Sequence, residues 1–275
     1  MEEAFAGSNS LKVLIIADVD IISSGLLDEK YVKEAPTFDM ILLCGPFTHR
    51  ECSSQEEIAL VHGDISAIVA QLENIVCRVC YLGSEMDPTA ILTEQLHLTP
   101  NSINIHARRL PVCDGLFLMG FAETAGNLKE TGLPEDVDRS AESDEEMDGV
   151  GVQSTASSIE VIEEILEEGI ALAADNKAMT GMFCFHYKYT HTLNHVLFHM
   201  PNMTNKAGVK LMVMPPSVQL ESESAPNAPR LPARLGPLTI ATPGSLRQGG
   251  HHCSVSLSRG NGGEWNIDGV ENLTL

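Results

Sequence analysis

The hydrophobic residues of this chain alternate between short continuous runs and segments with helical spacing. Residues 11–18 form an apolar run that ends in Ala-Asp, which predicts a buried strand with an acid at its carboxyl end. Three further runs predict strands at 39–45, 75–82 and 114–121. Between the second and third runs, apolar residues recur at the spacing of an amphipathic helix: Ile58, Val61, Ile65, Ile68, Val69 and Leu72. This alternation of strands and helices predicts an α/β layered domain.

The second half of the chain begins with a sharp change of composition. Residues 124–157 are rich in glycine, serine and acids and nearly free of large apolar side chains, which predicts a disordered insertion. Ser158 then caps a predicted helix with apolar residues at 159, 162, 165, 166 and 170. The remaining chain predicts late strands at 194–200 and 209–214, a linker at 215–236 and a strand meander at 238–275.

Length and composition favour one domain. We expect an N-terminal tail at 1–10 and a single domain at 11–275, because 275 residues suffice for one large core.

The net charge of −21 makes nucleic acid an unlikely partner, since affinity for phosphate backbones depends on Lys and Arg. No apolar run approaches the roughly 18 residues of a membrane span, so no membrane contact is expected. The chain has seven cysteines, an odd number, which favours free thiols in a reducing compartment. The N-terminus is acidic and lacks a signal-peptide core, so we expect the protein in the cytoplasm.

Three candidate site positions follow predicted strands: Asp18, Gly45 and Glu85. In α/β sheets, sites form beyond the carboxyl ends of strands, so these positions predict one shared site. Asp18, Asp20 and Glu85 would repel one another there. A metal ion, or alternatively His199 or a nearby Lys or Arg, is expected to neutralise them.

Four segments resemble a known series of active-site motifs. They are LKVLIIADVD (11–20), FDMILLCGPFT (38–48), RVCYLGSEMDP (78–88) and GPLTIATPGSLRQGG (236–250). Their order and spacing resemble the calcineurin-like metallophosphoesterases, whose motifs read D-x-H, G-D-x-x-D, G-N-H-D/E, a lone His after a strand, and G-H-x-H. The resemblance implies an α/β sandwich of two mixed β-sheets flanked by helices. It also implies a family site with two divalent metal ions that clamp a phosphoester.

Position by position, the resemblance leaves four candidate metal ligands. Asp18 matches the first aspartate of the family, and Asp20 stands in place of its histidine. Glu85 falls at the metal-binding asparagine of the third motif, and His199 resembles the lone histidine. A second carboxylate at Asp20 still suits a hard ion such as Mg²⁺ or Mn²⁺.

Other positions have lost the chemistry of the family. Pro46 replaces the bridging aspartate and has no ligand atom, and Met86 replaces the catalytic histidine and cannot protonate a leaving group. Pro216 lies where the last motif should carry imidazoles. We therefore assign no catalytic residue. The turn Pro243-Gly244-Ser245 resembles a family turn before a strand and is interpreted as scaffold.

Two functions are compatible with these replacements. The first is a catalytically degenerate phosphoesterase-fold protein that acts as a scaffold or interaction subunit for a protein partner. The second is a divergent metal-dependent phosphoesterase that uses Asp18, Asp20, Glu85 and His199 with one Mn²⁺ or Mg²⁺ ion. The phrase ILLCGPFTHRE also looks like a segment of the B subunits of replicative DNA polymerases, which are inactive assembly subunits on the same scaffold. That similarity favours the first function.

Four histidines form a dense cluster, and the last three are spaced by four residues: His186, His191, His195 and His199. On a helix this spacing would allow a shared Zn²⁺ ion. The neighbouring β-branched and aromatic residues favour a polar loop that leads into a strand instead. Cys77-x-x-Cys80 has no second cysteine pair, so no zinc site is expected there.

Overall fold

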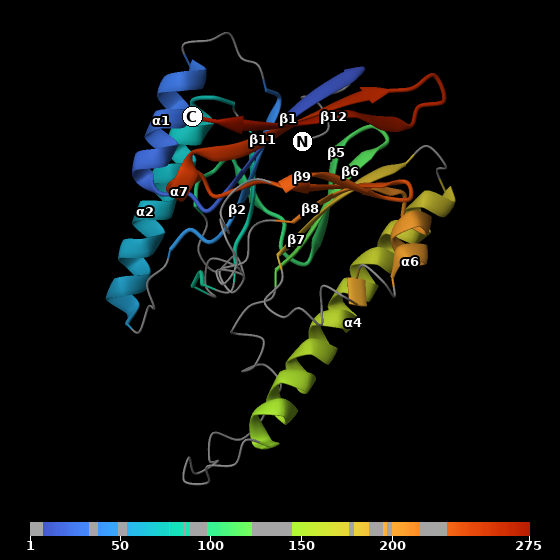
Figure 1. The fold of residues 1–275 in the computed structure, drawn as a ribbon, viewed down its shortest axis with the longest axis horizontal. Helices are drawn as coiled ribbons and strands as arrows, with labels where there is room; N and C mark the ends of the chain where they lie inside the picture. The colour runs from blue at the N-terminus through green and yellow to red at the C-terminus, as the bar shows by residue number, and fades with distance from the viewer. Residues whose placement is uncertain are drawn as a thin grey trace.

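The fold is seen in a computed structural model of the chain. It describes residues 8–32, 38–48, 54–76, 78–84, 86–88, 98–122, 145–175, 179–186, 195–196, 200–214 and 230–275. Two six-stranded sheets pack face to face, and helices lie on the outer side of each (Figure 1). This confirms the expected α/β sandwich of two mixed sheets flanked by helices.

The first sheet has the strand order β12-β11-β1-β2-β3-β4. Its strands are β1 (Ser10–Ala17), β2 (Met40–Cys44), β3 (Val79–Leu82), β4 (Ser102–Asn104), β11 (His251–Arg259) and β12 (Trp265–Thr274). Strands β1 to β4 are parallel, whereas β11 pairs antiparallel with β1 and with β12. The carboxyl ends of β1, β2 and β3 therefore share one edge, as the apolar runs predicted.

The second sheet has the strand order β5-β6-β7-β8-β10-β9. Its strands are β5 (Arg108–Cys113), β6 (Leu116–Ala122), β7 (Thr180–His186), β8 (Val209–Val213), β9 (Arg230–Leu235) and β10 (Leu238–Thr242). The central strands β6, β7, β8 and β10 are parallel, and the two outer strands are antiparallel to their neighbours. This sheet is mixed like the first.

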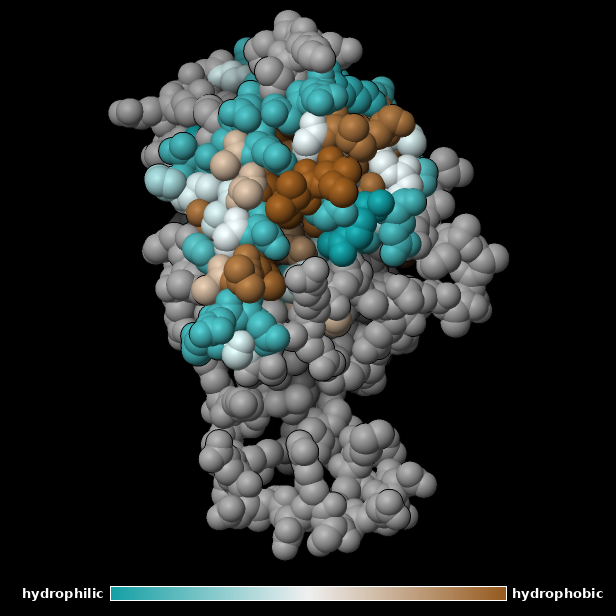
Figure 2. Space-filling model, turned by 90° about the vertical axis from the view of Figure 1, so that its left-hand side faces the viewer, coloured by the Kyte–Doolittle hydropathy of each residue, from teal (hydrophilic) through white to brown (hydrophobic). Residues whose placement is uncertain are grey.

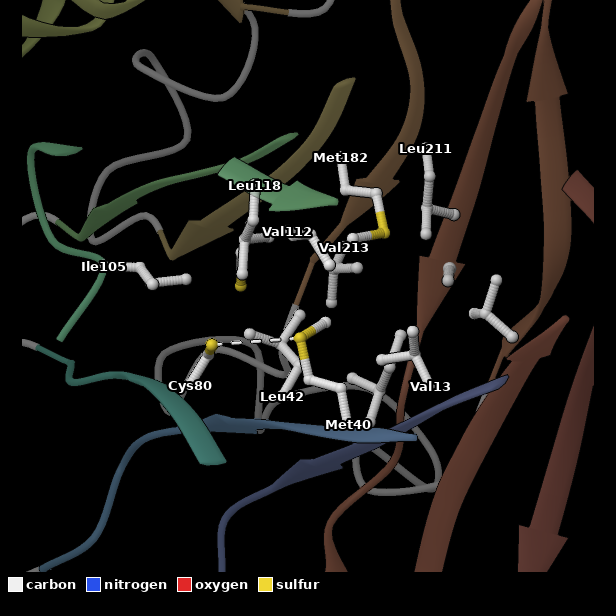
Figure 3. Close-up of a cluster of buried hydrophobic side chains, with 14 of the residues drawn as sticks. Val13, Met40, Leu42, Cys80, Ile105, Val112, Leu118, Met182, Leu211 and Val213 are labelled. Atoms are coloured by element: carbon white, nitrogen blue, oxygen red, sulfur yellow. Dashed lines mark hydrogen bonds between the residues drawn. The ribbon is translucent and has the colours of Figure 1, made fainter. Parts of the chain in front are cut away.

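The main core lies between the sheets. Figure 3 shows side chains of β2 and β3 pointing toward those of β6, β7 and β8. The Cys80 thiol lies 3.8 Å from the Met40 sulfur within this cluster. Side chains alternate between the two faces of a strand, so every second residue faces this core and the others face the helices. On β7, Met182 and Cys184 belong to the inter-sheet core, whereas Phe183 and Phe185 pack on the outer side.

Helices cover both outer faces. On the first sheet these are α1 (Ile21–Val32) and α2 (Gln55–Glu73), on the second α4 (Glu145–Asp175) and α6 (Pro201–Lys206), and the short α7 (Leu246–Gly249) precedes β11. Helix α2 begins at a capping box between Ser54 and Glu57. It buries the residues that the periodicity indicated: Val61, Ile65, Ile68, Val69 and Leu72.

Three predicted boundaries are wrong. Helix α4 begins at Glu145 rather than near Ser158, so residues 145–157 are not an unstructured insertion. This stretch contains no proline, and helices propagate cooperatively from a well-packed segment. Residues 195–196 form part of a helical turn rather than the strand predicted at 194–200, because the Met200 N–H donates to the His195 carbonyl at 3.2 Å. Strand β9 occupies the end of the predicted linker at 215–236, where it pairs with β10.

Two other expectations concern membranes and cysteines. Across the described ranges, helices are all too short or too polar to pass through a bilayer. The described cysteines are buried free thiols, as the odd cysteine count suggested: Cys44, Cys80, Cys113, Cys184 and Cys253.

Candidate functional site

The candidate site lies where the carboxyl ends of the parallel strands of both sheets meet. Cys44, the last residue of β2, contacts Cys184 near the end of β7, with the two sulfurs 3.4 Å apart. Burial, and then the neighbouring Cys184 thiol, raise the pKa of Cys44 well above its ordinary value. The Cys44 thiol is therefore a protonated packing group beneath the site rather than a nucleophile.

Asp18 directly follows strand β1 at the centre of this edge. Its backbone adopts a left-handed conformation with φ of 50°, which aspartate tolerates better than most residues. The Asp18 N–H donates to the Cys44 carbonyl at 3.2 Å, and the Asp18 carbonyl accepts from the Arg247 N–H at 2.9 Å. The turn that follows β1 is thereby fixed from both sides, and the Asp18 side chain is buried.

The carboxylate of Asp18 is held by two residues that follow strand β10. The Ser245 hydroxyl donates to Oδ2 at 2.5 Å. The guanidinium Nε of Arg247 lies 3.3 Å from Oδ1, an ion-pair distance without the alignment of a hydrogen bond. The Arg247 Nη2 also donates to the Val19 carbonyl at 3.2 Å, which fixes the guanidinium at this edge.

Asp20 serves as the N-cap of helix α1. Its Oδ1 accepts from the Ser23 N–H at 2.8 Å and from the Ser23 hydroxyl at 2.7 Å. Its Oδ2 lies 4.0 Å from Arg247 Nε. Burial pushes the pKa of Asp20 upward, but the Ser23 hydrogen bonds and the Arg247 charge outweigh it and leave the pKa below its ordinary value.

Asp87 ties the loop after β3 to the loop after β2. Its Oδ1 accepts from the N–H groups of Phe47 and Thr48 at 2.7 and 3.1 Å, and its Oδ2 accepts from the Ser84 N–H at 2.8 Å. Burial raises the pKa of Asp87 to about 6 despite these donors. A side chain at Gly45 would collide with the Asp87 carboxylate and lie 2.8 Å from the Ser84 nitrogen, so only glycine fits there. The following Gly45–Pro46 peptide bond is cis.

Known structures identify this arrangement of sheets. The protein TT1561 of Thermus thermophilus aligns with a TM-score of 0.53 and 14% identity, over 96% of this chain and 98% of that one. A Staphylococcus aureus protein named as a 5′-nucleotidase, in complex with alpha-ketoglutarate, aligns with a TM-score of 0.55 and 10% identity, over 96% of this chain and 54% of that one.

The Haemophilus influenzae NAD nucleotidase aligns with a TM-score of 0.51 and 11% identity, over 97% of this chain and 50% of that one. The fold is that of the calcineurin-like metallophosphoesterases. The chain spans about half the length of the two nucleotidases. No protein-family model and no curated protein sequence matches it.

Of the predicted metal ligands of this fold, the structure describes two. Asp18 and Asp20 lie together at the end of β1, as the sequence suggested, with Arg247 beside both. Glu85 and His199 lie outside the described residues, and their assignment stays a prediction. Within the described ranges, no three His, Cys, Asp or Glu side chains are grouped so that they could hold a metal ion.

One described histidine was not chosen from the sequence. His186 is the last residue of β7, buried at 1% exposure, and it shares the inter-sheet side with Met182 and Cys184. The family resemblance implies a lone histidine at the end of a strand, and His186 is the last residue of β7. The apolar run that ends in His186 (TGMFCFH) was the available signal, but the run VLFHM before Pro201 resembled the family strand and histidine and gave His199.

The described side chains do not fit a binuclear metal centre. The guanidinium of Arg247 lies against the carboxylates that would bind one ion. Pro46, which the motif resemblance aligns with the bridging aspartate, offers no ligand atom. The Asp87 carboxylate accepts from three backbone N–H groups and the Ser84 hydroxyl, and it holds two loops together. This edge is therefore organised by hydrogen bonds and one internal cation.

Proposed function

We propose that this chain is a catalytically degenerate protein of the calcineurin-like phosphoesterase fold, which acts as a scaffold or interaction subunit for a protein partner. The observation that carries the proposal is the position of Arg247. Its guanidinium neutralises Asp18 directly and lies within ion-pair distance of Asp20. An internal cation thus occupies the electrostatic role that a divalent ion has in an active enzyme of this fold.

The charge and position of Arg247 oppose the binding of a divalent ion at Asp18 and Asp20. A divalent ion that bound Asp18 and Asp20 would have to expel the guanidinium, because two cations in contact repel strongly in a partly buried site. It would also have to displace the hydrogen bond from the Ser245 hydroxyl to Asp18. The N-cap bond of Asp20 to Ser23 would compete as well. Metal binding at Asp18 and Asp20 therefore requires the free energy to break these interactions, which a site without such internal partners does not require.

Two replacements in the sequence support the same conclusion. Pro46 cannot bridge two ions, and Met86 cannot donate a proton to a leaving alkoxide. The half-buried Met86 lies directly before Asp87, whose carboxylate keeps the loop in place. The loop scaffold persists while the reactive side chain has changed. We place the protein in the cytoplasm, with a protein rather than nucleic acid or membrane as partner.

The alternative is a divergent metal-dependent phosphoesterase that uses Asp18, Asp20, Glu85 and His199 with one Mn²⁺ or Mg²⁺ ion. The nucleotidase names of two structures with the same fold favour a hydrolase for this alternative. Arg247 retains 24% side-chain exposure, so it could swing toward solvent and leave two carboxylates for one ion.

Hydrolysis assays separate the two functions. Purified protein is incubated with bis-p-nitrophenyl phosphate and with a nucleoside monophosphate, each with Mn²⁺ and with Mg²⁺. The proposal predicts turnover no higher in the wild type than in Asp18→Ala. Metal-dependent turnover that Asp18→Ala abolishes would establish the phosphoesterase instead. Arg247→Lys serves as a control, because it keeps the cation and most of the packing.

A further inference from the structure

Helix α1 exposes three large apolar side chains beside the candidate site. Ile21 is 41% exposed, Ile22 77% and Leu26 49%. Ile21 directly follows Asp20, the N-cap that pairs with Arg247. Figure 2 looks onto the side of the molecule that carries α1 and α2, and it shows hydrophobic residues gathered among hydrophilic ones. We call Ile21, Ile22 and Leu26 the α1 patch.

The α1 patch is not needed to hold the helix on its sheet. Helix α1 already buries a separate face through Ser24, Leu27 and Tyr31, of which Leu27 and Tyr31 pack in the core cluster under the helices. Ser24 also donates a hydrogen bond to Gln71 of α2, so the two helices lie side by side. Ile22 and Leu26 are four residues apart and form a second apolar stripe that points away from the protein. Contiguous exposed apolar surface of this kind marks interaction sites.

The charges around the patch select its partner. Helices α1 and α2 together contain one lysine, Lys30, whose ammonium already donates to the Thr274 carbonyl. The acidic residues of the same two helices are Asp28, Glu29, Glu56, Glu57, Asp64 and Glu73. The apolar stripe continues into the exposed Glu29, and the chain carries a net charge of −21, which is complementary to an amphipathic helix with a leucine-rich face and basic flanks. This chain carries a net charge of −21, so a second copy of it and an anionic bilayer would both repel it. Both are therefore disfavoured as partners of the patch.

We propose that the α1 patch docks a basic amphipathic helix of a partner protein. The proposal rests on the proposed function, since it names the surface and the partner chemistry of the interaction subunit. In such a complex Ile22 and Leu26 insert between the apolar residues of the incoming helix. Glu29, which lies one turn beyond Leu26 on the same face of α1, meets a basic flank of that helix. The position of the patch next to Asp20 places the partner at the edge where an enzyme of this fold receives its substrate.

The test uses full-length protein and a synthetic helix of leucine and lysine whose leucines lie at i, i+4 and i+7. A second peptide has the same composition with the leucines distributed around the helix. Binding is measured by fluorescence anisotropy at low and at high salt. We expect the first peptide to bind at least tenfold tighter than the second, and high salt to weaken its binding. The double variant Ile22→Ser/Leu26→Ser should lose at least tenfold.

The matched control is Leu235→Ser, which removes an exposed leucine from β9 on the other sheet and should leave binding unchanged. Circular dichroism establishes that each variant is folded. Equal binding of both peptides, or unchanged binding by the double variant, would overturn the proposal. So would a dimer of the wild-type chain, or adsorption to phosphatidylglycerol vesicles, that the double variant loses. Failure here leaves the absence of hydrolysis standing, because the phosphoesterase assays are independent of peptide binding.

Discussion

The guanidinium of Arg247 lies 3.3 Å from the carboxylate of Asp18, at the point where strand β1 ends. The two residues come from opposite ends of the chain, and the Ala17–Ser245 bridge brings those ends together. In an active phosphoesterase of this fold, the aspartate after the first strand meets a metal ion. Here the last third of the chain supplies both an arginine and a serine to the same carboxylate.

Arg247→Met should make the protein responsive to divalent metals. The methionine keeps most of the side-chain volume but leaves Asp18 and Asp20 without their cation. We expect a loss of about 1–3 kcal/mol in the free energy of unfolding, because a buried carboxylate loses its partner. Millimolar Mn²⁺ should restore part of that loss in thermal melts. Arg234→Met, an exposed arginine on β9, is the control and should show neither effect. A variant as stable as the wild type, with no response to Mn²⁺, would contradict the electrostatic role of Arg247.

Asp20→Ala should destabilise the protein through the start of helix α1. Loss of the N-cap bonds to Ser23 should cost about 1 kcal/mol, and Asp20→Ser should retain most of it because serine also caps helices. The sign of the pH effect follows from the lowered pKa of Asp20, whose ordinary value is 3.8. Its contribution is present above that value and is lost as the pH falls through the lower folded-state pKa. Urea unfolding at neutral and acidic pH measures both. A loss in Asp20→Ala that persists unchanged at pH 2 would contradict this assignment.

Asp87 should titrate near pH 6 in the folded protein. Burial raises its pKa to about 6 from 3.8, so the folded state holds this proton more tightly than the unfolded state. Its contribution to stability is therefore present below pH 4 and is lost as the pH rises through 6. Carbon-13 NMR of the Asp87 carboxyl group measures the pKa directly. Asp87→Asn should remove this pH dependence and cost about 1–3 kcal/mol, because its amide would face the Ser84 N–H donor. A carboxyl carbon that titrates at an ordinary pKa would refute the assignment.

Residues 124–144 should be dispensable for folding. They lie outside the described residues, and the prediction rests on their sequence, which offers few large apolar side chains. Replacing them with a short Gly-Ser linker should change the free energy of unfolding by about 1 kcal/mol or less, since closure entropy depends only weakly on loop length. Ile162→Ala, which truncates a fully buried side chain of α4, is the contrasting variant and should cost about 2–5 kcal/mol. A large loss in the deletion variant would show that the segment packs against the core.

Local patterns in the sequence predicted most of the scaffold. Apolar runs located β1, β2, β3 and β6, because a strand buried on both faces needs hydrophobic residues at almost every position. The position of Asp18 after such a run located the site. Helix α4 shows the limit of this approach, because its first turns carry no amphipathic signal and depend on the packed half that follows.

The partners within the site could not be predicted in the same way. The position of Arg247 beside Asp18 depends on the pairing of β11 with β1, which no local pattern reveals. The sequence allowed a nearby Lys or Arg to neutralise the acids but could not name it. His186 was missed because the apolar segment at 194–200 predicted a strand that ends near His199. Asp20 was predicted as a metal ligand, and no local pattern showed that its carboxylate also caps helix α1.

The most direct test of the central claim is calorimetric titration of Mn²⁺ into metal-free wild-type protein, with Asp18→Asn alongside. If Arg247 has taken the place of the metal, the wild type should show no saturable binding at micromolar Mn²⁺, and its trace should match that of Asp18→Asn. Thermal melts at a hundredfold excess over any dissociation constant would otherwise gain about 2.7 kcal/mol of stability. Stoichiometric binding by the wild type that Asp18→Asn abolishes would mean that the edge of the sandwich is a working metal site.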